Sequence, residues 1–220
     1  MPVRPYIYNP PREPWTDVLH EDEHLLVLNK QSGLLSVPGK AEEHRDCLET
    51  RVQERYPEAL QVHRLDRGTS GIFIMARTRE AQSFLQRGFQ RRLTEKHYVA
   101  EVFGIIEADD GTVDLPLHTD WPNRPMQKVD FEIGKPALTH WKVLERGEGT
   151  TRVSLRPVTG RSHQLRVHML ELGHPILGDD FYASDEALAM SDRLCLHAES
   201  LSFPHPRDKE RVTFKAPCLF

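Results

Sequence analysis

The sequence predicts an α+β protein with a mixed, mainly antiparallel sheet. Short strand patterns outnumber helical ones, and several of them follow one another at hairpin-like spacing. A doubly wound fold would need strands and helices in strict alternation, which the chain lacks. The 220 residues contain no Ser/Gly-rich linker, repeat or low-complexity tract. We therefore expect a single domain over residues 15–220.

The strand predictions rest on short runs of strand-forming residues that are bounded by turn residues. The last two runs flank the polar segment 205–209, which predicts a β-hairpin there. The predicted strands cover residues 25–28, 71–76, 98–103, 139–144, 151–156, 194–196, 200–203 and 211–214.

Two segments have apolar residues at helical spacing. In 79–92 these residues recur at i, i+3, i+4, i+7 and i+8, and Thr78 is placed to cap the helix N-terminus. The second predicted helix covers 162–172, with Ser162 as its N-cap and Gly173 at its end.

Composition excludes several classes of protein. The formal net charge is −4 and the isoelectric point is near 6.3, so any nucleic-acid site has to be a local basic patch. No apolar run approaches the ~20 residues of a membrane span, so no membrane partner is expected. The three cysteines form no CxxC pair, which fits a reducing cytoplasm. Residues 1–14 are Pro-rich and aperiodic, which predicts an extended arm.

The first segment with more polar groups than a core requires follows the predicted strand 25–28. Lys30 comes directly after the strand and precedes a loop that contains Gly33 and Gly39. The loop resembles one that faces a phosphate, but it lacks the GxxxxGK[ST] spacing of a nucleotide site. A solvated lysine at a strand end explains the pattern equally well.

The second segment, His63-Arg64-Leu65-Asp66-Arg67-Gly68-Thr69-Ser70, leads into the strand 71–76. Asp66 lies between Arg64 and Arg67, and these cations favour its ionised form. The aspartate is therefore a candidate nucleophile or base. The alternative is an ordinary Arg–Asp turn in which Thr69 and Ser70 bond to the backbone. A Ser–His–Asp triad within this segment fails, because residues so close in one extended loop cannot line up side by side.

The third segment, Gly160 to His168, is predicted to be a strand-to-helix turn. Its backbone N–H groups, together with Arg161, would suit an anion. His163 and His168 are five residues apart and do not share a helix face, so a zinc site is not expected. His168 falls on the apolar stripe and is predicted to be a hydrogen-bonded core residue. Arg166 lies at the edge of that stripe, where it would reach a buried carboxylate.

Two basic clusters are candidates for RNA binding. Arg87, Arg91 and Arg92 lie on the predicted helix 79–92, where a solvated helix face is the alternative. Arg124 follows Trp121 on a Pro-rich loop that also carries Lys128. Cations beside an aromatic ring suit single-stranded or looped RNA, whose bases stack on rings and guanidinium groups.

The order of these motifs resembles the pseudouridine synthase family, and within it the bacterial ribosomal large-subunit branch. The chain departs from the family at Gln31, where proline is usual, and we expect no basic N-terminal RNA-binding domain of the kind that many relatives carry. The motifs that carry the resemblance are Asn29-Lys30 with Ser32-Gly33, His63-Arg64-Leu65-Asp66 with Thr69-Ser70-Gly71, Lys96-His97-Tyr98-Val99-Ala100 and Gly160-Arg161-Ser162-His163-Gln164-Leu165-Arg166-Val167-His168.

The resemblance implies a central mixed sheet with flanking helices and an RNA-binding cleft. It also implies an isomerisation without cofactor or metal, in which the C1′–N1 bond of a uridine breaks and a C1′–C5 bond forms. Asp66 would be the essential carboxylate, as nucleophile or as proton acceptor. Tyr98 would stack on the uracil and Arg166 would pair with Asp66.

The implied substrates are loop uridines in a tRNA anticodon stem-loop and in a 23S rRNA hairpin, and no obligate protein partner is expected. Loops suit the reaction because an unpaired base is extruded at the lowest cost. Arg64 would help to place the flipped base. The residues expected to bind substrate are Lys30, His63, Arg64, Thr69, Arg87, Arg91, Arg92, Arg124, Arg161 and Gln164.

Two other functions remain as alternatives. An RNA N-glycosidase would also use Asp66, but glycosidic hydrolysis commonly needs paired carboxylates, and no second acid lies near Asp66 in any motif. An inactive RNA-binding module would be expected to lack Asp66 or Tyr98, and both residues are present.

Overall fold

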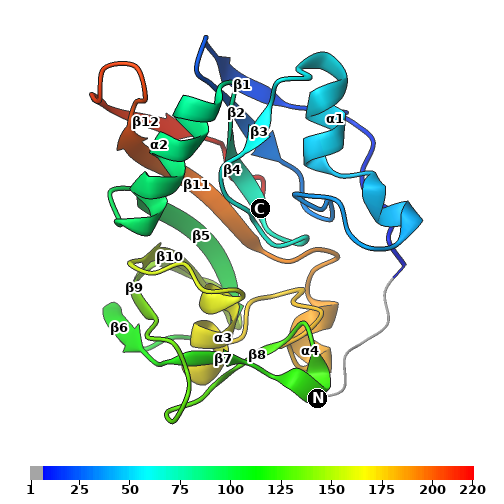
Figure 1. Cartoon of the computed structure of the whole chain (residues 1–220). Helices are drawn as coiled ribbons and strands as arrows, with labels where there is room; N and C mark the ends of the chain where they lie inside the picture. The colour runs from blue at the N-terminus through cyan, green and yellow to red at the C-terminus, as the bar shows by residue number, and fades with distance from the viewer. Residues whose placement is uncertain (1–6) are drawn as a thin grey trace. The chain divides into compact units, whose positions relative to one another are not determined.

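The computed structural model describes residues 7–220, which fold as two compact units (Figure 1). The terminal unit comprises residues 7–96 and 197–219, and the middle unit comprises residues 97–196 with Phe220. The first six residues of the predicted arm lie outside the described residues. The expectation of one domain over 15–220 stays a prediction. No helix within residues 7–220 is long and apolar enough to cross a membrane.

The terminal unit contains a mixed sheet with the strand order β1-β2-β4-β11-β12, and β3 also pairs with β4. The β4 and β11 strands are parallel, and the other pairs are antiparallel. The strands are β1 (Val18–Glu21), β2 (Leu25–Lys30), β3 (Leu60–Gln61), β4 (Ser70–Ala76), β11 (Leu196–Pro204) and β12 (Arg211–Lys215). The helices are α1 (Leu48–Arg55), α2 (Arg79–Gln90) and a 3₁₀ turn over Glu42–Arg45.

The core of the terminal unit lies between its sheet and α2. The helix presents Ala81 and Leu85 to the sheet, where they pack with Ile72 and Ile74 of β4 and with Phe203 of β11. Every residue of β4 is buried, as expected for a strand covered on both faces. Thr78 caps α2 as predicted, because its hydroxyl accepts the N–H of Ala81 at 3.1 Å. The predicted hairpin around 205–209 is confirmed as β11–β12.

The middle unit contains an antiparallel set of strands in the order β5-β10-β9-β6 and a separate hairpin, β7-β8. Its strands are β5 (Glu95–Phe103), β6 (Asp110–Asp114), β7 (Leu117–Thr119), β8 (Gln127–Val129), β9 (Leu138–Arg146) and β10 (Thr150–Pro157). Its helices are α3 (Gln164–Glu171), α4 (Asp185–Ala189) and a 3₁₀ turn over Trp121–Asn123.

The helix α3 differs from the sequence prediction at its start and in its burial. Ser162 is not its N-cap; His163 occupies that position in the left-handed region at φ 52°. The first six residues of α3 are all buried, so the helix has no solvated face of the kind that an amphipathic stripe predicts. Its end is as predicted, because Gly173 adopts φ 85° and donates its N–H to the carbonyl of Leu170.

We expect Gly71→Ala to lower the free energy of unfolding by about 2–5 kcal/mol, from left-handed strain and overpacking together. Gly71 has φ 108°, and a Cβ there would lie 2.3 Å from the carbonyl oxygen of Ala198 on the neighbouring strand. Chemical denaturation measures the change. Gly149→Ala is the matched control, because Gly149 has φ 72° but open space around it. Equal effects at the two sites would show that the β4–β11 contact is not tight.

Candidate active site

Asp66 lies in the loop that connects β3 to β4. The N–H of Thr69 donates to the carbonyl of Asp66 at 3.2 Å, so the segment forms a turn. Leu65 and Thr69 are buried, whereas Asp66 between them is partly exposed. Arg64 is exposed. The turn therefore fixes the backbone of Asp66 while its side chain remains within reach of a ligand.

Side chains at the end of β2 and in the segment that follows it form hydrogen bonds to the backbone of this turn. Lys30 is completely buried, and its Nζ donates to the carbonyl of Arg67 at 3.0 Å, to that of Leu34 at 2.6 Å and to that of Gln31 at 2.8 Å. Three carbonyl dipoles thus stabilise the buried ammonium. Lys30 is accordingly neither the solvated lysine nor the phosphate-facing lysine that the sequence left open. Lys30 therefore has a structural role, because it holds the backbone next to Asp66.

Two serines extend this support to both sides of Asp66. Ser36 Oγ donates to the carbonyl of Leu65 at 2.7 Å and accepts the Leu65 N–H at 3.1 Å. Ser32 Oγ donates to the carbonyl of Gly68 at 2.6 Å. The backbone on either side of the carboxylate is therefore held by hydrogen bonds from one neighbouring loop.

His63 fixes the start of the same loop. Its ring lies between the rings of Phe73 on β4 and Phe89 on α2, at centroid distances of 4.7 Å and 4.8 Å. Its Nε2 accepts the N–H of Ile74 at 3.0 Å. Burial lowers the pKa of His63 to about 3, with a further contribution from the charge of Lys96, so the ring stays neutral. Its contacts are structural, and its predicted role in substrate binding stays a prediction.

Thr69 and Ser70, which end the loop, are buried. Ser70 Oγ lies 2.8 Å from Nδ1 of His197 on β11. The contact joins the β4 and β11 strands, and it pairs Ser70 with a histidine other than His63. Substrate binding by Thr69 stays a prediction.

Arg166 on α3 forms a buried ion pair within the middle unit. Its Nε and one terminal nitrogen donate to the two oxygens of Asp179 at 2.8 Å and 2.5 Å, and the same terminal nitrogen donates to Asp180 at 3.0 Å. Asp179 has no exposed surface and also accepts the N–H groups of Phe181 and Tyr182. The prediction that Arg166 reaches a buried carboxylate is therefore confirmed with Asp179. Its pairing with Asp66 stays a prediction.

Gln164 is buried at the start of α3, and both the oxygen and the nitrogen of its side-chain amide form hydrogen bonds. Its oxygen accepts from Thr159 Oγ1 at 2.7 Å and from the Arg161 N–H at 3.0 Å. Its nitrogen donates to the carbonyl of Leu138 and to Thr139 Oγ1, both at 3.0 Å. These contacts join the turn to β9. They give Gln164 a structural role, and its predicted role in substrate binding stays a prediction.

The anion site expected at the turn before α3 stays a prediction, and two of the backbone N–H groups at that turn are bonded within it. The N–H of Arg161 donates to the side chain of Gln164, and the N–H of Gln164 donates to the carbonyl of Arg161. Both donors are therefore used within the turn. The guanidinium of Arg161 donates to the carbonyl of Pro136 at 3.1 Å, and His163 Nδ1 lies 2.7 Å from the hydroxyl of Tyr182.

Two further predictions concern the middle unit. His168 is a core residue as predicted: it is buried, with Nδ1 2.9 Å from Thr139 Oγ1 and Nε2 3.2 Å from the carbonyl of Leu115. Tyr98 lies on β5 opposite Leu155 of β10, partly buried against the core of the unit. Its stacking on uracil stays a prediction.

Both basic clusters lie on the surface. Arg87, Arg91 and Arg92 are exposed at the C-terminal end of α2. Arg124 is exposed near the tip of the β7–β8 hairpin, with its guanidinium 4.7 Å from the ring centre of Trp121, which is 60% exposed. Both clusters thus offer cations to solvent, and the second offers a flat aromatic surface as well. Among residues 7–220, no group of three metal-ligating side chains is placed to hold a metal ion.

Comparison with known proteins assigns the chain to a family. Residues 24–171 match the family model for RNA pseudouridylate synthase. Two similar proteins are named dual-specificity RNA pseudouridine synthase RluA. That of Escherichia coli is 58% identical over 214 residues, which are 97% of this chain and 98% of its own length. That of Vibrio parahaemolyticus is 54% identical over 218 residues, covering 97% and 87% of the two chains.

A solved structure agrees with this result. Human RNA Pseudouridylate Synthase Domain Containing 1 has a TM-score of 0.78 and 30% identity, covering 92% of this chain and 83% of its own. The chain belongs to the RNA pseudouridylate synthase family. It is an isomerase that converts uridine in RNA to pseudouridine. The family and the α+β fold predicted from the sequence are thereby confirmed.

We expect Arg166→Met to lower the free energy of unfolding by about 3–5 kcal/mol, because Asp179 would remain buried without its cation. Urea denaturation measures the loss. Replacing both partners with apolar residues, as Arg166→Met with Asp179→Leu, should recover part of it. Arg207→Met is the surface control, because Arg207 pairs with Asp208 in solvent. Unchanged stability in Arg166→Met would show that the buried pair does not hold α3 in place.

Proposed function

We propose that this enzyme isomerises loop uridines in two classes of RNA, a tRNA anticodon stem-loop and a hairpin of 23S rRNA. The observation that carries the proposal is the alignment with dual-specificity enzymes along 97% of the chain at 58% identity. The cytoplasmic location expected from the sequence belongs to this proposal, because both RNAs are found there.

Asp66 is the reacting carboxylate in this proposal. Once the uridine is flipped out, Asp66 either attacks the nucleoside or removes a proton from the sugar, and the C1′–N1 bond breaks. The detached uracil rotates and forms the C1′–C5 bond, as the bond to Asp66 breaks or the sugar proton is returned; C5 then loses its proton and N1 gains one. Because the product is an isomer, no group is added or lost. The supports from Lys30, Ser32, Ser36 and His63 favour this role, because they fix the carboxylate backbone before substrate arrives.

The other residues act on the substrate around Asp66. Arg64, which is exposed, would occupy the space left in the RNA and help to place the flipped base. Tyr98 would stack on the uracil and assist proton transfer at C5. Arg166 would pair with Asp66 as well as with Asp179. Loop uridines are the favoured targets, because an unpaired base costs the least to extrude.

The experiment that tests the activity uses RNA labelled with tritium at uridine C5. Release of tritium without free uracil identifies the isomerisation. Free uracil would instead identify an N-glycosidase, and release of neither would identify an RNA-binding module without activity. Running the assay on an anticodon stem-loop and on a 23S rRNA hairpin tests each substrate class separately.

We expect Asp66→Asn to lower the rate of tritium release by more than 100-fold, because an amide cannot act as the nucleophile or the base. RNA affinity should stay within a few-fold of the wild type, since the carboxylate is used for bond making. Filter binding measures that affinity. Asp208→Asn makes the same chemical change on the exposed β11–β12 turn and should leave turnover unchanged. Residual activity above a hundredth of the wild type would remove Asp66 from the mechanism.

Replacing Arg87, Arg91 and Arg92 together with Gln should flatten the plot of log K against log salt by about 2, if each contacts a phosphate of single-stranded RNA. KM should rise more than kcat falls, because these contacts act equally in the ground and transition states. Titrations at several salt concentrations measure the slope.

The matched control for this triple variant replaces Arg55, Arg207 and Lys209, three exposed cations elsewhere in the terminal unit, with Gln. Both triple variants remove the same charge, so only local contacts distinguish them. An unchanged slope in the α2 variant would leave Arg87, Arg91 and Arg92 as a solvated helix face. The RNA would then have to lie along Arg124 and Lys128.

A further inference from the structure

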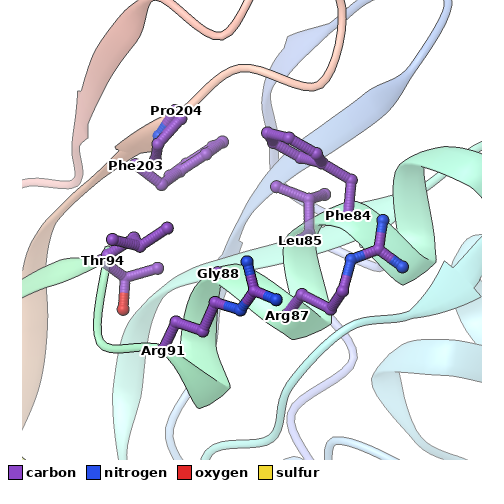
Figure 2. Close-up of a pocket in the computed structure, with 9 residues that line it drawn as sticks. Phe84, Leu85, Arg87, Gly88, Arg91, Thr94, Phe203 and Pro204 are labelled. Carbon is purple, nitrogen blue, oxygen red and sulfur yellow. The ribbon is translucent and has the colours of Figure 1, made fainter.

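A pocket of about 80 Å³ lies within the terminal unit, between the C-terminal half of α2 and the end of β11 (Figure 2). Its walls are the apolar side chains of Phe84, Leu85 and Leu93 together with Phe203 of β11. The pocket is open to solvent, and Leu93 at its edge is 47% exposed. An apolar hollow that remains accessible on the surface is a feature that binding sites share.

Two arginines border this pocket. Arg87 and Arg91 are one helical turn apart, and Figure 2 shows their side chains extending along the same side of α2. Both are exposed, so their charges are available to a ligand. The site therefore joins an apolar hollow to a pair of positive charges, which matches a ligand with a flat apolar part and a neighbouring anion.

Gly88 is part of the pocket lining. It lies inside α2 between the two arginines, and a Cβ built on it would meet no atom within 4 Å. Glycine within a helix costs about 1 kcal/mol relative to alanine. No positive φ and no close backbone contact accounts for glycine at this position. What the missing side chain does provide is space beside the apolar walls.

We propose that this pocket binds an unstacked base of the RNA substrate, outside the loop that carries the reacting uridine, with the adjoining phosphates on Arg87 and Arg91. The proposal rests on the proposed function. A nucleotide has both required parts, a ring with apolar faces and an anionic phosphate. Because the walls are mostly apolar, binding would depend on stacking and shape and would tolerate different bases.

The position of the pocket suits this role. It lies on α2, the helix whose Phe89 stacks on His63 three residues before Asp66. A base held there would be fixed on the element that also packs against the Asp66 loop. Docking a second nucleotide on this element would set the register of the RNA relative to the carboxylate, which is what a positioning contact requires.

The test compares Gly88→Leu with wild type on two RNAs: a minimal hairpin that contains the target uridine, and the same hairpin with single-stranded flanks. Leucine at position 88 fills the pocket, favours the helix and has room for its Cβ, so the fold should be retained. We expect Kd for the flanked RNA to rise about tenfold, in the range measured for loss of one stacked base. Binding and turnover of the minimal hairpin should stay unchanged.

A fluorescent base analogue, 2-aminopurine, placed in turn at each flanking position reports occupancy directly. One position should change its emission on binding to the wild type, and that change should disappear in Gly88→Leu. The matched control is Gly88→Ala, which adds only a methyl group and should keep most of the signal.

Three results would overturn the proposal. Gly88→Leu could bind the flanked RNA as well as the wild type does, or it could lose affinity equally for both RNAs, which would trace the effect to the site around Asp66. Alternatively, an acidic peptide with an apolar residue could bind to the wild type but not to Gly88→Leu, while RNA binding stayed the same in both. The pocket would then be a peptide site. Failure of the proposed function is distinguishable, because wild type would then bind these RNAs but release no tritium from either.

Discussion

Lys30 has no exposed surface, and the loop that carries Asp66 depends on how this buried charge is stabilised. A buried ammonium costs several kcal/mol unless hydrogen bonds replace its hydration. Here three backbone carbonyls accept hydrogen bonds from the ammonium, and one of them belongs to Arg67, the residue after Asp66. If the Asp66 loop moved away, the buried ammonium would lose the hydrogen bond to the Arg67 carbonyl. The cost of burying the charge thus favours the observed position of the loop, together with the hydrogen bonds from Ser32 and Ser36.

The loop that follows Lys30 is itself held by residues of the Pro-rich arm. The hydroxyl of Tyr8 accepts the N–H of Leu35 and donates to the carbonyl of Asp46, so the described part of the Pro-rich arm holds the supporting loop. Asp46 in turn pairs with Arg51 of α1, whose guanidinium also donates to the carbonyl of Pro11. Arm, helix and loop thus form one connected support, with Asp66 at its end.

Sequence periodicity predicted those parts of the fold whose burial follows a simple pattern. Helix α2 has one apolar face and a threonine cap, and both features are visible in the sequence. Helix α1 was missed because its buried residues include Arg51, which is held by an ion pair. The strands β7 and β8 were missed because they are three residues long.

The sequence motifs name candidate site residues but do not show how the fold uses them. A motif shows which residue types are present, but it does not show where their hydrogen bonds go. Lys30 and Gln164 have the side chains of ligand-binding residues, yet the structure uses them to hold backbone turns. Asp179, the partner of Arg166, lies thirteen residues away beyond the end of α3, and nothing in the local spacing identifies the pair.

Burial also sorts the arginines into two groups, which matters for an acidic protein that binds RNA. Arg51 and Arg166 are almost completely buried and pair with Asp46 and Asp179, so their charges are neutralised within the fold. The cations that reach solvent at the proposed RNA contacts are fewer and clustered: Arg64, Arg87, Arg91, Arg92 and Arg124. With a net charge of −4, attraction at long range is weak, and these clusters act mainly over about one Debye length. RNA affinity then depends on local contacts, so stacking on Trp121 or in the α2 pocket carries a larger share of it than in a generally basic protein.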